Sequence, residues 1–150
     1  MPTVESPDFA SAALRHIRDA EFLAAPGERA SFDQAWHLAG FAHECARKSF
    51  LRDGWVPKLL GHDFDDAGER VVQIAIALDP RASRLPIAGW AAKYPTIAQW
   101  RPDHRYERTG ATIRNPERRL DALLAEARQA VDASMIALLL DGSLPIEVLR

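Results

Sequence analysis

WHLAGFAHECARKSFL, residues 36–51, is an apolar stretch in which ionisable side chains lie among small residues. Side chains that can pack in a core recur in it at spacings of three and four: Leu38, Phe41, Ala42, Cys45 and Ser49. This spacing predicts an α-helix that turns one face toward a core. Gly40 lies among alanines, so we expect a neighbouring helix to approach closely at this point.

The ends of this helix carry their own signals. A capping box predicts that it begins at Ser31, whose hydroxyl would accept a hydrogen bond from the backbone of Gln34, and Gly54 predicts its end. Within it, Glu44 precedes Lys48 by four residues, which is the favourable order for an ion pair. The pair is either solvated or partly buried in a polar network that stabilises the fold.

Composition limits the class of protein. The chain has 150 residues, a net charge of −2 and a single cysteine, so we expect one domain, residues 1–150, without an intrachain disulfide. It has no apolar run long enough to span a membrane, and Glu5 and Asp8 lie where a signal peptide would be basic and then apolar. We therefore expect a cytoplasmic protein that does not enter a membrane and binds nucleic acid only through a local patch.

Three further helices are predicted from start and stop signals. These signals are Ser6-Pro7-Asp8 and Pro26-Gly27, then Asp63 or Asp65 and Asp79-Pro80, then Asn115-Pro116-Glu117 and Asp141-Gly142. The buried edge predicted for the middle one consists of Val71, Ile74, Ala75 and Leu78. Between the last two helices we expect one short helix near Ile87 to Lys93 in a connection rich in proline and aromatic residues. The predicted fold class is all-α, an up-and-down four-helix bundle with this irregular connection.

Several motifs, in this order and spacing, resemble the HEPN domain family. They are His16, Asp19-Ala20, Leu38-Ala39-Gly40-Phe41-Ala42-x-Glu44-Cys45-x-x-Lys48, Gly61-His62-Asp63 and Trp100-x-x-x-x-Arg105-Tyr106. The resemblance implies a helical bundle that commonly forms homodimers. It also implies a place in toxin–antitoxin or other defence systems, often as a metal-independent ribonuclease or beside a nucleotidyltransferase partner.

Two departures from the family pattern bear on activity. The family's ribonuclease signature is an arginine, four to six residues and then a histidine, whereas Arg29 precedes His37 by seven intervening residues and Arg101 precedes His104 by two. Without that spacing, the expected acid–base mechanism lacks its histidine, which would move a proton, and its arginine, which would stabilise negative charge on the phosphate. In addition, Arg47 stands where the family usually has leucine. The sequence therefore favours binding over catalysis.

Arginines and aromatic residues concentrate in residues 100–119. The candidate nucleic-acid-binding residues are Arg101, Arg105, Arg108, Arg114, Arg118 and Arg119. Arginines interleaved with aromatic rings are typical of surfaces that contact phosphates and bases. The alternative is structural: Arg105 meets Glu44, and with Tyr106 it anchors the irregular connection onto the central helix. In that interpretation the polar network consists of Glu44, Lys48, Arg105 and Tyr106.

Three functions follow from these observations. The first is a HEPN-like binding or partner module, expected to be a homodimer that binds RNA or nucleotide beside a nucleotidyltransferase, toxin or antitoxin partner. The second is a divergent metal-independent ribonuclease toxin with candidate catalytic residues His62, His104 and Arg105. The third is an antitoxin or immunity-type protein that neutralises a partner enzyme. No paired-cysteine metal motif or glycine-rich phosphate loop is present, so we predict no metal and no cofactor.

Overall fold

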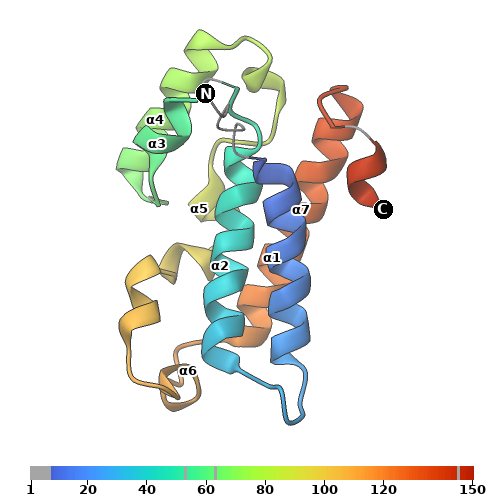
Figure 1. Ribbon diagram of the computed structural model, residues 1–150. Helices are drawn as coiled ribbons and strands as arrows, with labels where there is room; N and C mark the ends of the chain where they lie inside the picture. Colours follow the sequence, from blue (N-terminus) through green and yellow to red (C-terminus); the bar gives the residue numbers. More distant parts are fainter. Residues whose placement is uncertain (1–7, 53, 63, 145) are drawn as a thin grey trace, which may run out of the picture.

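The computed structural model describes residues 8–52, 54–62, 64–144 and 146–150, and these residues form helices and no strand (Figure 1). The α-helices are α1 Phe9–Ala24, α2 Phe32–Lys48, α3 Val56–Leu60, α4 Asp66–Leu78, α5 Trp90–Lys93, α6 Ala111–Arg114 and α7 Leu120–Leu140. Short 3-10 helices are η1 Ala82–Arg84, η2 Ile97–Gln99, η3 Pro102–Tyr106 and η4 Ile146–Leu149. The predicted all-α class is confirmed. None of the helices described is both long and apolar enough to cross a membrane.

Helix α2 lies at the centre of the fold. The long helices α1 and α7 pack against it and against each other, and α6 and η3 also contact it. In Figure 1, α3 and α4 lie near the C-terminal end of α2, while α6 lies near its N-terminal end. Helix α4 packs with α3 and η1, so three of the four predicted long helices form the central group and the fourth lies at one end of it.

The face that α2 buries differs from the predicted one. Leu38, Phe41, Cys45 and Ser49 are only half-buried, although Ala42 is fully buried. The buried side of the helix includes Trp36, Ala39, Gly40, His43, Glu44, Ala46, Arg47 and Lys48. Polar side chains can be buried in this way because each finds a partner there. Arg47, for example, donates to Glu69 on α4 at 3.1 Å and stacks on Trp90.

Gly40 is covered by a side chain rather than by a neighbouring helix. The indole of Trp100 lies flat against it, so closely that a Cβ added to Gly40 would lie 2.1 Å from Trp100 Cε2. Trp100 itself is completely buried. The small residue therefore allows the middle of the irregular connection to dock onto α2.

Some of the predicted helix ends are correct. Asp8 caps α1 by accepting from Ser11 N–H, and Asp65 caps α4 by accepting from two backbone N–H groups. Asp79 and Asp141 follow the last residues of α4 and α7, as predicted. The short helix predicted near Ile87 to Lys93 is α5. Ser6, Pro7 and Asp63, which belong to the other predicted start signals, lie outside the described residues.

Other predicted ends and edges are wrong. Helix α2 begins directly after Ser31, as predicted, but the hydroxyl of Ser31 makes no capping bond and the helix ends at Lys48, before Gly54. Helix α7 begins at Leu120 because Asn115 forms a local turn, in which its side chain accepts from Glu117 N–H at 3.0 Å. On the predicted buried edge of α4, Ile74 and Leu78 are exposed, and the buried residues of this helix are Gly68, Val72 and Ala75.

Candidate functional site

A buried carboxylate on α2 organises one polar network. Glu44 is only 6% exposed, and its Oε1 accepts from Lys48 Nζ at 2.7 Å. Its Oε2 lies 2.5 Å from His62 Nδ1. Because an ionised carboxylate can only accept, Nδ1 of His62 carries the proton and donates it. The ring is therefore held by one nitrogen, and Nε2 is left for other partners. Of the two interpretations of Glu44 and Lys48, the structure shows the buried one.

Arg105 and Tyr106 lie outside this network, contrary to expectation. Both carboxylate oxygens of Glu44 are engaged by Lys48 and His62. The Arg105 guanidinium instead lies 4.7 Å from the centre of the Tyr106 ring, and both side chains are exposed. The anchoring contacts of η3 come from His104 and from Trp100 just before it.

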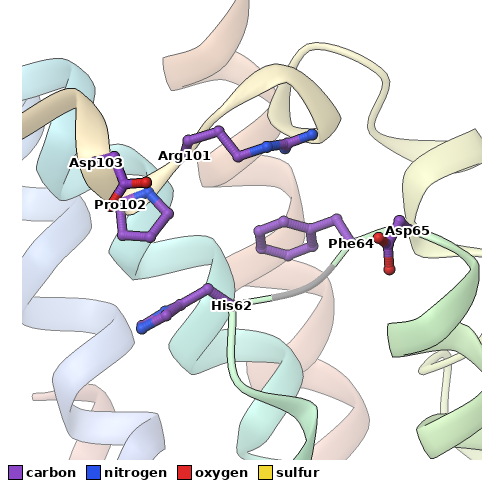
Figure 2. A pocket seen from close by; sticks show the side chains of 6 residues that line it. All are labelled: His62, Phe64, Asp65, Arg101, Pro102 and Asp103. Atoms are coloured by element: carbon purple, nitrogen blue, oxygen red, sulfur yellow. The ribbon is translucent and has the colours of Figure 1, made fainter.

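Two clefts adjoin η3. The larger, the His62 cleft, has a volume of about 410 Å³ and is lined by His62, Phe64, Asp65, Arg101, Pro102 and Asp103 (Figure 2). The smaller, the arginine cleft, has a volume of about 110 Å³, and its lining includes Trp36, His37, His104, Arg105, Arg108 and Arg118. The clefts are neighbours because residues 101–103 line the first, whereas 104 and 105 line the second. The candidate catalytic residues are thus divided: His62 in one cleft, His104 and Arg105 in the other.

Four of the six candidate arginines have partners within the chain. Arg118 pairs with Glu107 at 2.6 Å, and Arg119 pairs with Asp121 at 3.0 Å. The guanidinium groups of Arg101 and Arg114 donate to backbone carbonyl oxygens.

Arg105 and Arg108 differ from these four. Both are exposed, and neither forms an ion pair within the described part of the chain. Their positive charges are therefore available to a ligand at the edge of the arginine cleft.

Asp33 positions the loop that carries Arg108. Its Oδ2 accepts from Gly110 N–H at 2.6 Å and its Oδ1 from Thr112 N–H at 2.9 Å, so the first turn of α2 holds the start of α6. Charge-assisted bonds of this kind are stronger than neutral ones. Sequence reasoning missed this role because its partners are 77 and 79 residues away.

Two histidines accept hydrogen bonds from tryptophans. His104 Nδ1 accepts from Trp36 Nε1 at 3.0 Å, and His43 Nδ1 accepts from Trp90 Nε1 at the same distance. A ring nitrogen that accepts carries no proton, so both rings are neutral. Burial, followed by the charge of nearby Arg118, lowers the pKa of His104. His104 therefore holds η3 on α2 and is poorly arranged to take a proton at Nδ1.

We expect the free energy of unfolding to fall as the pH is lowered from 7 to 5. Burial is the largest cause of a lowered pKa at four histidines: His16, His37, His43 and His104. Below the ordinary histidine pKa of about 6.5, the unfolded chain therefore binds protons that the folded chain does not. Stability from these groups is complete above that pH and is lost below it.

Urea unfolding at the two pH values measures this change. We expect a loss of about 1–3 kcal/mol, since each proton taken up on unfolding contributes about 1.4 kcal/mol per pH unit. Carboxylates whose pKa is lowered from 3.8, such as that of Asp141, where bonds from Ser143 and Arg81 are the largest causes, lose their contribution only at lower pH. If the free energy of unfolding stays constant or rises as the pH is lowered from 7 to 5, the histidine rings bonded to tryptophans are not neutral as described.

Comparisons with known proteins add no assignment. No protein family, curated protein or solved structure matches the chain. Among the described residues, no group of three or more histidine, cysteine, aspartate or glutamate side chains could hold a metal ion. Any functional assignment must therefore be argued from the two clefts themselves.

Proposed function

We propose that this chain is a HEPN-like binding module that holds a nucleotide or single-stranded RNA at the arginine cleft. The observation that carries the proposal is the exposure of Arg105 and Arg108 without acidic partners in the described part of the chain. They lie beside a cleft whose other walls include His37, the Arg118–Glu107 ion pair and Asp33. With a net charge of −2, the protein has no general attraction for polyanions, so a local patch has to supply it.

The dimensions and chemistry of the arginine cleft suit a phosphate group. At about 110 Å³, it holds the equivalent of three or four waters, since a water takes about 30 Å³ in the liquid. Guanidinium groups match phosphate oxygens with paired N–H donors. Tyr106, 75% exposed beneath Arg105, offers a ring on which a base can stack. A phosphate in the cleft and a base on this ring together describe one nucleotide.

Replacing either Arg105 or Arg108 with alanine is expected to weaken RNA binding. Arg105→Ala and Arg108→Ala should each raise the Kd for a labelled single-stranded RNA about tenfold at low salt, because each removes a charge-assisted phosphate contact. Fluorescence anisotropy measures the affinity. Arg119→Ala is the matched control, since that arginine already pairs with Asp121 and should leave the Kd unchanged. Equal losses in all three variants would indicate general charge attraction and not a site.

The remaining parts of the proposal rest on the motif resemblance. They are a homodimer, a cytoplasmic location and a role in a toxin–antitoxin or defence system, beside a nucleotidyltransferase, toxin or antitoxin partner. Sedimentation equilibrium of the purified chain tests the first of these directly: a homodimer gives twice the mass of 16.7 kDa. An antitoxin or immunity role requires inhibition of a partner enzyme, and co-purification from the native host tests for such a partner.

A second candidate, the metal-independent ribonuclease, is favoured by one observation. The exposed His62 and Arg101 line the same cleft, and buried Glu44 holds the histidine by Nδ1. Nε2 could then move a proton while an arginine stabilises developing negative charge on phosphate. RNA cleavage in EDTA tests this: His62→Ala should abolish it in a protein that circular dichroism shows to be folded, and Arg105→Ala should retain it. Absence of cleavage by the parent protein excludes the second candidate.

A further inference from the structure

We propose that the His62 cleft is a nucleobase subsite that prefers bases carrying an amino group. The inference rests on the proposed function, because it names the part of a nucleotide or RNA ligand that lies beside the arginine cleft. It assigns to His62, Arg101 and Asp103 a direct contact with the base, over a cleft floor that includes the buried Phe64.

The volume of the cleft separates it from a phosphate site. About 410 Å³ corresponds to roughly a dozen waters, several times the capacity of the arginine cleft. A phosphate group would leave most of this space filled with water, whereas a planar base can use it. The walls are also less basic. One arginine and one histidine lie with two carboxylates here, whereas the arginine cleft has three arginines and two histidines with two carboxylates.

The aromatic walls are held rigidly enough to stack on a base. His62 presents a half-exposed ring that is bonded through Nδ1 to the buried Glu44 carboxylate, and Lys48 holds Glu44 in turn. Figure 2 shows the Phe64 ring pointing into the space between His62 and Arg101. Phe64 is only 6% exposed, and its ring packs edge-on against His43 with 5.1 Å between the ring centroids, so it forms part of the cleft floor. The exposed aromatic face of the cleft is therefore the ring of His62. Unpaired bases bind proteins by stacking on rings of this kind.

The polar walls favour a particular base edge. Asp65 is held in place as the cap of α4, because its Oδ1 accepts from two backbone N–H groups of that helix. Asp103 is exposed, and it lies across the cleft from Phe64, next to Pro102. A carboxylate accepts from an exocyclic amino group such as N4 of cytosine. Uracil has no amino group. Its edge presents one N–H between two carbonyl oxygens, and a carboxylate repels these oxygens. The Nη1 of Arg101 already donates to two backbone carbonyl oxygens, and its other guanidinium nitrogens can donate to the ring acceptor next to the amino group of cytosine.

The position of η3 connects this subsite with the arginine cleft. Residues 101–105 pass from one cleft to the other, and the five residues of η3 rise only about 10 Å along a 3-10 helix. A flexible single strand can therefore place a phosphate against Arg105 and a neighbouring base against His62. The ligand class is a single-stranded nucleic acid with an unpaired cytosine, adenine or guanine next to the nucleotide held at the arginine cleft.

Cytidine and uridine are the probes for this subsite, because they match in size and carry no phosphate. We expect cytidine to shift the ring resonances of His62 in NMR titrations and to bind at least tenfold more tightly than uridine. Asp103→Asn should abolish that preference, since its amide can also donate to the carbonyl oxygen O4 of uridine. Asp66→Asn replaces an exposed aspartate on α4 that does not line the cleft, and it should retain the preference.

The outcomes separate this inference from the proposed function. Arg105→Ala should leave cytidine binding unchanged, so loss of RNA binding in that variant together with intact nucleoside binding supports both sites. Equal affinity of the parent protein for the two nucleosides, or an unchanged preference in Asp103→Asn, overturns the base subsite even if RNA binds at the arginines. If neither nucleoside shifts His62, the base subsite is likewise overturned, whereas the arginine cleft is judged by RNA binding alone.

Discussion

Gly40→Ala is expected to destabilise the fold by about 3 kcal/mol, near the upper end of the cost of overpacking a core. The added Cβ would lie within 2.2 Å of three atoms of the Trp100 indole, a distance at which atoms cannot coexist. Trp100 is completely buried and cannot move outward without opening the contact between the irregular connection and α2. The cost exceeds the gain of about 1 kcal/mol that alanine brings to a helix interior. Urea unfolding measures the difference.

Two comparisons identify the clash as the cause. Gly54→Ala should change the stability by less than about 0.5 kcal/mol, because none of the residues that the structure describes lies within 4 Å of its added Cβ. In a Trp100→Ala background, Gly40→Ala should cost little or even stabilise the helix, so the two substitutions should be strongly non-additive. If Gly40→Ala costs the same in both backgrounds, the indole does not pack on Gly40 as described.

Glu44→Ala is expected to cost about 3–5 kcal/mol, the range for removing one member of a buried ion pair. Lys48 is 8% exposed, so its ammonium would lose its carboxylate partner in a place where water cannot replace it. His62 would also lose the acceptor that holds its ring. We expect a lower free energy of unfolding in urea and a change in the NMR resonances of the His62 ring in protein that remains folded.

The double variant Glu44→Leu with Lys48→Met tests whether the unpaired Lys48 ammonium causes the loss of stability. Replacing both charges with apolar side chains leaves no unpaired group, so the double variant should be more stable than Glu44→Ala. Glu117→Ala removes an exposed carboxylate and should have almost no effect. A Glu44→Ala protein as stable as Glu117→Ala would contradict the burial of the ion pair.

The central helix could be recognised from the sequence because its signals are local. The periodicity of residues 36–51 predicted α2, and Asp79 and Asp141 predicted two helix ends. The prediction of which face α2 buries was wrong, because the buried face depends on partners that lie far along the chain. The Trp100 ring covers Gly40, and Trp36 bonds to His104 across 68 residues. No spacing rule within one helix contains that information.

The site was predicted only in part for the same reason. The sequence indicated His62 and the arginines of residues 101–119, but it could not show which arginines have partners in the chain. The sequence also predicted that Arg105 pairs with Glu44, whereas Glu44 bonds to His62, 18 residues away. Asp33 lies inside the predicted capping box between Ser31 and Gln34, and only the folded chain brings it to Gly110. Residue types were thus predictable, but their pairings required the three-dimensional structure.

The salt dependence of single-stranded RNA binding tests the central claim most directly. If Arg105 and Arg108 hold phosphates, log K should fall linearly with log salt concentration, with a slope of about −0.7 for each phosphate neutralised on a single strand. We predict a slope of about −1.4 for two contacts in the parent protein and about half of that in Arg105→Ala. No binding at low salt, or the same slope in both proteins, would contradict an RNA site at the arginine cleft.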